Sequence, residues 1–304
     1  MLECELERSS MARFKGIYAN LLTALTPDGN AFEPGAQRDY VEWVVTEGVH
    51  GVSTSLSSGE FGYHTAEERL AIIDCVIRTV NKRVPVLAGV SESTLRATCD
   101  LAKRVEGCGA DAVMVMPRSY FVLNEAEVLN YFETVLNSVN IAIGIYNNPS
   151  ATGIDIDADL YEKIVRLDPK RIIVSKDGSG KLFRTPDVLS RCENFSLLQG
   201  FAQLMYGALL HGAPGTDFVM SSLLPRHFVR IYDNIAVHRD LDEAKRSYER
   251  LLPLFRLMER YDVTRLAKAL APMLNLKLGP HRKPVLPLAQ EVTSEVQRIV
   301  RDLG

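Results

Sequence analysis

The chain has 304 residues, of which 46% are hydrophobic and 24% charged, with 35 Lys and Arg against 38 Asp and Glu. This composition provides enough apolar surface for a core and excludes disordered, collagen-like and coiled-coil classes. The net charge of −3 and the absence of long Lys/Arg runs argue against a nucleic-acid partner or a polybasic membrane anchor. We therefore expect the partners to be small molecules or further copies of the chain.

The N-terminus and the cysteines indicate the cellular compartment. The first ten residues are acidic and contain no apolar stretch, which differs from a signal peptide. No window of about 18 apolar residues is present, which argues against a membrane partner and a membrane-spanning helix. The five cysteines are odd in number, widely spaced and never in a Cys-x-x-Cys pair. This pattern is typical of reduced thiols, so we predict a cytoplasmic protein without disulfides or a zinc ribbon.

From Phe14 onward, short β-branched or apolar runs alternate about eight times with longer segments of helical period. The predicted strands are, in chain order, Ile17–Leu25, Gly51–Thr54, Pro85–Gly89, Ala112–Met116, Ala142–Tyr146, Ile172–Lys176, Ser196–Gly200 and Thr216–Met220. The predicted helices between them are Ala36–Glu47, Thr65–Val80, Thr94–Gly107, Glu125–Ser138, Asp157–Leu167, Thr185–Arg191 and Ala202–His211. Strict alternation implies parallel strands that are joined by right-handed crossovers.

Eight such units predict an α/β fold, a (β/α)8 TIM barrel, whose typical size is about 250 residues. The alternative is an open doubly wound sheet, but its first strand-to-helix turn should contain a Gly-x-Gly-x-x-Gly loop, which is absent. After about Val237 the sequence predicts only helices, over Asp240–Glu259, Val263–Leu276 and Ala289–Leu303. We therefore expect an N-terminal extension (1–13), the barrel (14–236) and a C-terminal helical subdomain (237–304).

Lys176 stands at the end of the sixth predicted strand, and catalytic groups of TIM barrels lie at the carboxyl ends of strands. A buried ammonium group is costly unless it is paired or neutral. A neutral lysine amine is a nucleophile that forms Schiff bases with carbonyl substrates. The alternative for a lysine at this place is a side chain that extends past the rim into solvent.

Tyr146 ends the fifth predicted strand, next to the strand of Lys176, so its phenol is expected near the lysine amine. There it could relay the protons that imine formation requires, although a strand-end tyrosine can also be a simple core aromatic. Ser57, Ser58 and Gly59 follow the second predicted strand. Such a turn can direct backbone N–H groups at a carboxylate, but Ser/Gly loops also occur as plain turns.

Together these segments resemble the dihydrodipicolinate synthase/N-acetylneuraminate lyase family of class I, pyruvate-type aldolases. The resemblance extends over about 14–237 and the helical tail. The matching segments are Leu56-Ser57-Ser58-Gly59-Glu60, in which the family's first Gly is replaced, Pro117-Arg118-Ser119-Tyr120, Tyr146-Asn147-Asn148-Pro149 and Lys176-Asp177.

The resemblance implies a role for each matched residue. Lys176 is the Schiff-base lysine, which condenses with the keto carbon of pyruvate or another 2-oxo acid, and Tyr146 is the proton shuttle. Ser57 and Ser58, in the same loop as Gly59, match the pair that binds the carboxylate of the 2-oxo acid and relays protons. No metal or organic cofactor is implied, because the protonated imine is itself the electron sink.

Tyr120 resembles the tyrosine that reaches across an interface into a neighbouring subunit's site in family tetramers. A shift of one residue would put Ser119 or Phe121 at that place instead. The resemblance therefore implies a homo-oligomer, a tetramer or a dimer. The six histidines are scattered without metal-ligand spacing, so we interpret them as structural or surface residues.

Two departures from the family pattern concern the substrate. Ala151 stands where the synthase has an arginine that grips the carboxylate of aspartate semialdehyde, and a methyl group cannot replace a bidentate clamp. Arg118 is the nearest basic residue that could substitute for it. Asp217 stands in the eighth strand where the family usually has an apolar residue, and it could bind a polyhydroxylated or amine-bearing substrate. Its alternative role is to cap the strand or to bind backbone.

The leading hypothesis is a Schiff-base-forming lyase or aldolase of 2-oxo acids, with pyruvate as the imine partner and a 2-keto-3-deoxy or 4-hydroxy-2-oxo acid as substrate. The alternatives are a dehydratase or deaminase that uses the same lysine imine, or a 4-hydroxy-tetrahydrodipicolinate synthase in which another base replaces the missing arginine. A non-catalytic binding barrel is disfavoured because both Lys176 and Tyr146 are present. A phosphate-binding barrel is disfavoured because the seventh and eighth strand ends lack a glycine-rich loop.

Overall fold

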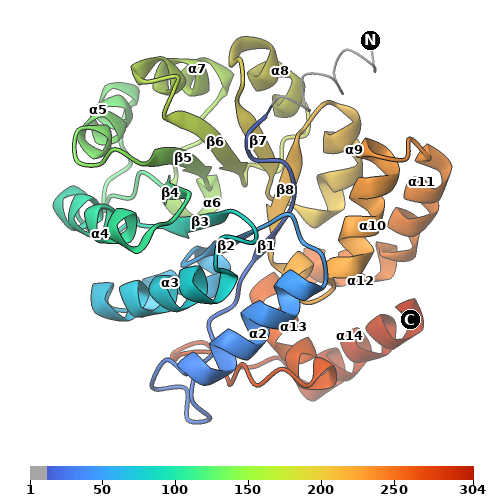
Figure 1. The fold of residues 1–304 in the computed structure, drawn as a ribbon. Helices are drawn as coiled ribbons and strands as arrows, with labels where there is room; N and C mark the ends of the chain where they lie inside the picture. Colours follow the sequence, from blue (N-terminus) through green and yellow to red (C-terminus); the bar gives the residue numbers. More distant parts are fainter. Residues whose placement is uncertain (1–11) are drawn as a thin grey trace.

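The structure is a computed structural model that describes residues 12–304. Its centre is a closed barrel of eight parallel strands, in which each strand pairs with the next and the last pairs with the first (Figure 1). The strands are β1 (Gly16–Asn20), β2 (Gly51–Thr54), β3 (Val86–Gly89), β4 (Ala112–Val115), β5 (Ala142–Asn147), β6 (Ile172–Asp177), β7 (Ser196–Gln199) and β8 (Gly215–Phe218). The predicted (β/α)8 barrel is confirmed.

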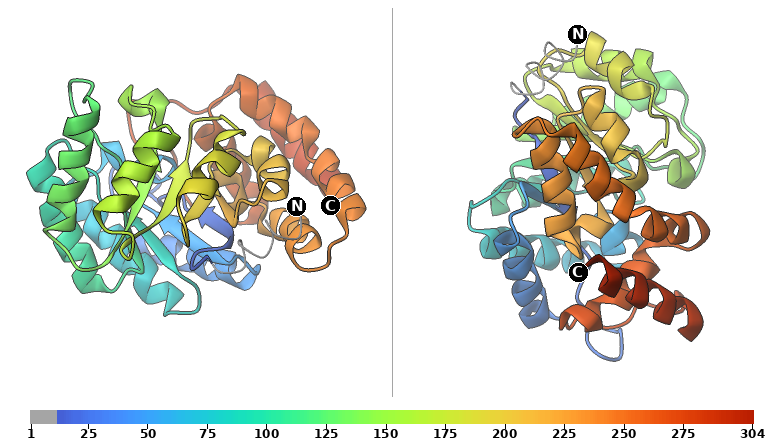
Figure 2. Two further views of the ribbon diagram at one scale, coloured as in Figure 1. Left: turned by 90° about the horizontal axis from the view of Figure 1, so that it is seen from above. Right: turned by 90° about the vertical axis from the view of Figure 1, so that its right-hand side faces the viewer.

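Helices surround this barrel, and a further group lies on one side of it (Figure 2). The surrounding helices are α2 (Pro34–Thr46), α3 (Ala66–Val80), α4 (Leu95–Cys108), α5 (Glu125–Leu136), α7 (Ala158–Leu167), α8 (Arg184–Arg191), α9 (Met205–Leu210) and α10 (Pro225–Ala236), with the short α6 (Pro149–Thr152) after β5. The C-terminal group is α11 (Leu241–Arg250), α12 (Leu252–Arg260), α13 (Val263–Leu270) and α14 (Gln290–Leu303). Most of the predicted extension, residues 1–13, lies outside the described residues.

Several predicted elements were wrong in extent, and the short α6 as well as α10 was missed. The predicted helix over 240–259 divides at Leu251 into α11 and α12, because Pro253 in the first turn of α12 has no N–H to continue the ladder. The helix predicted over 263–276 ends at Leu270 and continues as a 3-10 turn that contains Pro272. The sequence did not predict α10, which closes the eighth βα unit.

The first strand ends at Asn20 instead of Leu25. The backbone N–H of Ala24 donates to the Gln37 side chain, and that of Leu25 donates to the carbonyl of Leu278 in the C-terminal part of the chain. The apolar run that suggested a longer strand therefore continues as a connection whose donors are satisfied outside the sheet.

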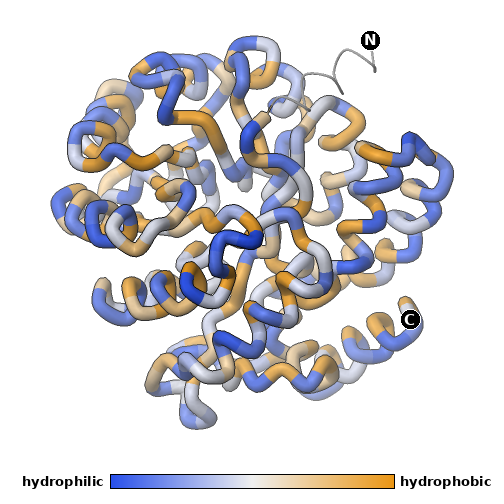
Figure 3. Tube along the Cα trace, in the orientation of Figure 1, coloured by the Kyte–Doolittle hydropathy of each residue, from blue (hydrophilic) through white to orange (hydrophobic). Residues whose placement is uncertain are grey.

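Side chains of successive strand residues alternate between the barrel interior and the layer under the helices. On β1, Tyr18 lies in the interior cluster, whereas Ile17 and Ala19 belong to the outer core. Figure 3 shows hydrophobic residues along the strands and alternating with hydrophilic residues along the surrounding helices. Residues that are paired across neighbouring parallel strands face the same side, and Tyr146 pairs with Lys176. Because Tyr146 lies in the interior cluster, Lys176 also points inward.

A buried charge cluster ties the loop after β2 to the C-terminal part of the chain. The Glu60 carboxylate is 5% exposed and lies 2.6 Å from the Lys268 amine on α13 and 3.2 Å from Nδ1 of His281. The backbone N–H of Arg282 also donates to Glu60, at 3.0 Å. Burial by itself would raise the pKa of Glu60, but its contacts with His281 and Lys268 outweigh burial and lower the pKa to about 2.

We predict that Glu60→Gln destabilises the protein by about 3–5 kcal/mol at pH 7, because it leaves the Lys268 ammonium buried without its carboxylate. Because the folded-state pKa of Glu60 is lowered, its contribution is fully present above about pH 4.5 and is lost as the pH falls toward about 2. The difference in unfolding free energy between wild type and variant, measured by urea titration, should therefore shrink between pH 5 and pH 3.

Glu42→Gln is the matched control, because Glu42 forms an exposed ion pair with Arg83. Its expected cost is less than about 1 kcal/mol. A Glu60→Gln cost that is equally small, or that does not change with pH, would contradict the assigned role of the cluster.

Candidate active site

The loop after β2 presents the Ser57 hydroxyl at the carboxyl end of the barrel. Ser55 and Glu60, on either side, adopt left-handed backbone conformations, each with φ of 56°, and the chain between them makes the 3-10 turn Ser57–Gly59. The hydroxyl of Thr23 donates to the carbonyl of Gly59 at 2.7 Å, which fixes this turn to the segment after β1. As a result, the Ser57 side chain is exposed while Ser58 is buried.

Tyr146, on β5, lies with its ring in the barrel interior and its hydroxyl at the Ser57 loop. The two hydroxyl oxygens share a hydrogen bond of 2.8 Å. The side-chain amide of Asn148 donates to the Tyr146 hydroxyl at 3.1 Å and to the Ser57 hydroxyl at 3.4 Å. The sequence placed Asn148 within a matching segment but assigned it no role. The structure thus joins two predicted site residues, Tyr146 and Ser57, and adds an amide that orients both hydroxyls.

Lys176, on β6, is the neighbour of Tyr146 across the sheet. Its side chain is 5% exposed, and its Nζ lies 5.2 Å from the centre of the Tyr146 ring. Lys176 therefore does not extend past the rim into solvent, which rules out the alternative considered for its sequence position. The predicted proximity of the Lys176 amine to the Tyr146 side chain is present in the structure.

Asp217, on β8, faces Lys176 across the interior of the barrel. Its carboxylate is fully buried, accepts a hydrogen bond from the Ser53 hydroxyl at 2.7 Å and lies 3.6 Å from the Lys176 Nζ. Burial raises the pKa of Asp217, and the Lys176 charge and the Ser53 hydrogen bond offset only part of that effect. Asp217 is thus a partner of the lysine amine, and its carboxylate contacts the side chains of Ser53 and Lys176.

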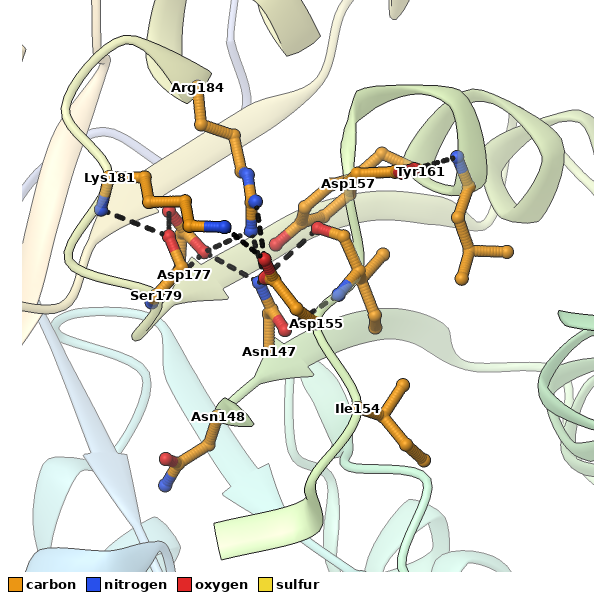
Figure 4. Close-up of polar contacts among 12 residues, drawn as sticks. Asn147, Asn148, Ile154, Asp155, Asp157, Tyr161, Asp177, Ser179, Lys181 and Arg184 are labelled. Carbon is orange, nitrogen blue, oxygen red and sulfur yellow. Dashed lines mark hydrogen bonds and ion pairs between the residues drawn. The ribbon is translucent and has the colours of Figure 1, made fainter. Parts of the chain in front are cut away.

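A second polar network lies on the opposite face of the same two strand ends (Figure 4). The amide of Asn147, at the end of β5, donates to the Asp177 carboxylate at the end of β6, at 2.8 Å. Arg184, on α8, binds Asp155 through both of its terminal nitrogens, and its Nη1 lies 3.9 Å from Asp177. The hydroxyl of Ser179 donates to the other oxygen of Asp177 at 2.8 Å.

This network fixes the backbone on which the interior side chains stand. Asn147 and Asp177 each follow directly after Tyr146 and Lys176, and their side chains point outward while those of Tyr146 and Lys176 point inward. Hydrogen bonds from Arg184 hold the pKa of Asp155 well below its usual range, whereas burial raises the pKa of Asp177. The sequence motifs included Asn147 and Asp177, but Asp155 and Arg184 gave no sequence signal.

Tyr120 is not brought to Lys176 within this chain. It lies in the loop after β4, its side chain is 95% exposed, and its ring packs edge-on against Phe121 at 5.0 Å between ring centres. Ser119 beside it is also exposed.

Ala151, which replaces the clamping arginine, and Arg118, the candidate substitute, follow different strands. Ala151 is exposed on the short α6, after β5. The guanidinium carbon of Arg118, in the loop after β4, lies 5.5 Å from the centre of the Phe61 ring, and that of the buried Arg69 lies 5.0 Å from the same ring. Arg118 is therefore held beside the loop that follows β2.

Within residues 12–304, no group of three or more His, Cys, Asp or Glu side chains is arranged to hold a metal ion. None of the helices in this part of the chain is long and apolar enough to cross a membrane. The cysteines that the structure describes, Cys75, Cys99, Cys108 and Cys192, are free thiols, and Cys4 lies outside the described residues.

The fold and the Lys–Tyr–Ser arrangement define a class of barrel lyases, and comparison with known proteins identifies the family. The model of the dihydrodipicolinate synthetase family matches residues 13–303, so the chain belongs to this family. The predicted family resemblance and the prediction of a family lyase are confirmed.

Individual relatives match along nearly their whole length. A 4-hydroxy-tetrahydrodipicolinate synthase of Bartonella henselae is 32% identical over 291 residues, which is 95% of this chain and 98% of the relative. An uncharacterized DapA-like lyase of Pyrobaculum islandicum is 26% identical and covers 96% and 99% of the two chains. The crystal structure of YagE, a prophage protein of E. coli in complex with pyruvate, matches with a TM-score of 0.90, 25% identity and coverage of 96% and 99%.

We predict that Arg184→Met lowers the free energy of unfolding by about 3–5 kcal/mol, because it removes the cation beside the fully buried Asp177 carboxylate and leaves the partly buried Asp155 with Lys181 alone. Urea titration at pH 7 measures this change. Arg78→Met is the control, since Arg78 is 80% exposed in its pair with Asp74, and such a pair contributes less than about 1 kcal/mol. Equal effects of the two substitutions would refute the structural role of the network.

Proposed function

We propose that this enzyme is a Schiff-base-forming lyase of 2-oxo acids, with pyruvate as the imine partner. One observation supports this function most. The buried Lys176 amine lies at the Tyr146 ring, and the Tyr146 hydroxyl forms a hydrogen bond with Ser57 at the carboxyl end of the barrel. The pyruvate complex of the related protein YagE supports the same choice of substrate.

Imine formation needs a neutral amine and a proton relay. The Lys176 Nζ attacks the keto carbon of the 2-oxo acid and gives a carbinolamine. The former keto oxygen then departs as water. The product is an imine whose nitrogen, the former Nζ, is protonated and positively charged. Tyr146 is the group that supplies and removes these protons, with Ser57 as its hydrogen-bonded partner and Asn148 as the donor that orients both hydroxyls.

In the cleavage direction the substrate is a 4-hydroxy-2-oxo acid, of which 2-keto-3-deoxy acids are one kind. Tyr146 removes the proton of the 4-hydroxyl group, and the C3–C4 bond breaks to release an aldehyde. The electron pair of the broken C3–C4 bond moves into the iminium, which becomes a neutral enamine. Protonation at C3 and hydrolysis of the C=N bond then release pyruvate and regenerate the Lys176 amine.

We assign the carboxylate of the 2-oxo acid to the loop of Ser57, Ser58 and Gly59. This loop begins at the end of β2 and lies directly beside the Tyr146 hydroxyl, so a carboxylate bound there would put the adjacent keto carbon near the Lys176 amine. Asp217 remains proposed as a residue of the substrate-binding site.

The homo-oligomer, the role of Tyr120 in a neighbouring subunit's site and the cytoplasmic location stay predictions. The 95% exposure of the Tyr120 side chain supports the first two, because an aromatic ring left in solvent gains from burial against another copy of the chain.

Two alternatives use the same lysine. The imine can expel a β-leaving group instead of breaking a C–C bond, which gives a dehydratase or a deaminase. The name of the Bartonella henselae relative favours 4-hydroxy-tetrahydrodipicolinate synthase, whereas Ala151 in place of the clamping arginine argues against it. Arg118, whose guanidinium carbon lies 5.5 Å from the centre of the Phe61 ring, remains the candidate replacement.

Borohydride reduction in the presence of pyruvate tests the proposed mechanism. Intact mass and peptide mapping should find a pyruvate-sized adduct on Lys176, absent in Lys176→Ala and present in Lys163→Ala, which changes an exposed lysine on α7. Tyr146→Phe should slow adduct formation by about 10²–10⁴-fold, the usual contribution of a positioned acid–base group. Tyr206→Phe, on α9, should leave the rate unchanged. An enzyme that gives no adduct with pyruvate or any larger 2-oxo acid refutes the proposal.

The products distinguish cleavage from elimination. With a panel of 4-hydroxy-2-oxo acids and 2-keto-3-deoxy acids, we expect pyruvate and a free aldehyde in equal amounts, detected by mass spectrometry. Release of water or ammonia, with a 2-oxo acid of unchanged carbon count, would show elimination instead. Efficient condensation of pyruvate with aspartate semialdehyde would show synthase activity and contradict the inference from Ala151.

A further inference from the structure

The carboxylate of Asp217 is held in place by three strands of the closed barrel. Asp217 is on β8, Ser53, which donates to it at 2.7 Å, is on β2, and Lys176, at 3.6 Å, is on β6. All three residues are buried, and their backbones belong to strands of the closed sheet. The carboxylate is therefore fixed next to the nitrogen at which the proposed reaction develops its positive charge.

We propose that Asp217 is the counter-ion that stabilises the protonated imine on Lys176. This inference rests on the proposed function and assigns the charge balance of its central intermediate. When the neutral amine becomes the iminium, a positive charge develops on its nitrogen, and a fixed carboxylate at this distance favours the iminium over the neutral imine.

Few other groups can provide this charge. Tyr146 on β5 faces the amine with its ring, and Leu198, which pairs with Lys176 from β7, is apolar. Tyr18 on β1 pairs with Asp217; burial first, and the Asp217 charge second, raise the pKa of the Tyr18 phenol, so it stays a neutral phenol. Among the described residues, Asp217 is the carboxylate that forms an ion pair with Lys176.

The proposed counter-ion stabilises the iminium but disfavours the bond cleavage that follows. C–C cleavage moves an electron pair into the iminium and cancels its positive charge, so a nearby carboxylate favours the iminium over the enamine that follows. Asp217 is therefore expected to increase the amount of imine that accumulates and to speed the return of the enamine to the iminium by protonation at carbon.

Asp217→Asn tests the proposal, because it keeps the shape of the side chain and removes its charge. Cyanoborohydride reduces the protonated imine, so trapping of pyruvate on Lys176, followed by intact mass from pH 5 to pH 10, reports how far into alkali the imine keeps its proton. We call the pH above which trapping falls off the alkaline limit. In the variant this limit should move to lower pH by about 1–3 units, the usual effect of losing an opposite charge within 4–6 Å.

Two further variants make the result decisive. Asp111→Asn removes a carboxylate from the amino end of β4, where it accepts from the backbone N–H of Val86, and should leave the alkaline limit unchanged. Asp217→Leu removes the charge without burying an amide, should give the same displacement as Asp217→Asn, and replaces it if that variant does not fold, as judged by circular dichroism.

The outcomes separate this inference from the proposed function. A folded Asp217 variant that traps pyruvate with the wild-type pH limit overturns the counter-ion role, even if KM for hydroxylated substrates rises, which would indicate substrate binding alone. A wild-type enzyme that traps no 2-oxo acid at any pH overturns the proposed function instead.

Discussion

Hydrogen bonding between β8 and β1 closes the sheet, and the rest of the structure depends on that closure. A closed parallel barrel directs the carboxyl ends of all eight strands to one end. It also produces a narrow interior in which side chains from strands that are not neighbours come into contact. Lys176 on β6 and Asp217 on β8 meet in this way, although they do not share a pair of hydrogen-bonded strands.

The closed interior sets the electrostatics of the site. An ammonium group that is 5% exposed requires a partner, and the Asp217 carboxylate, itself bonded to Ser53, is the one in the described structure. A charged pair in this place costs more to bury than apolar side chains would, so its presence is better explained by chemistry at the lysine nitrogen than by stability. The charges of Lys176 and Asp217 therefore depend on each other.

The alternation of side chains along β5 and β6 separates chemistry from support. Tyr146 and Lys176 point into the barrel, while the next residues, Asn147 and Asp177, point outward to the network of Arg184. The outward groups fix the strand ends, and so they hold the backbone from which the reacting groups extend. The loop of Ser57 is fixed by a similar device, since Glu60 at its end is held by the C-terminal part of the chain.

The sequence by itself determined the alternation of eight strands with helices, and from it the barrel, because periodicity reports which face of each element is buried. It also determined that Tyr146 and Lys176 are neighbours, since consecutive strands of a barrel are adjacent. Only the tertiary structure decided that Asp217 and Ser53 lie at the lysine, because contacts across a closed barrel depend on strand tilt and register, which leave no local pattern in the sequence. The same holds for the hydrogen bonds of Asn148.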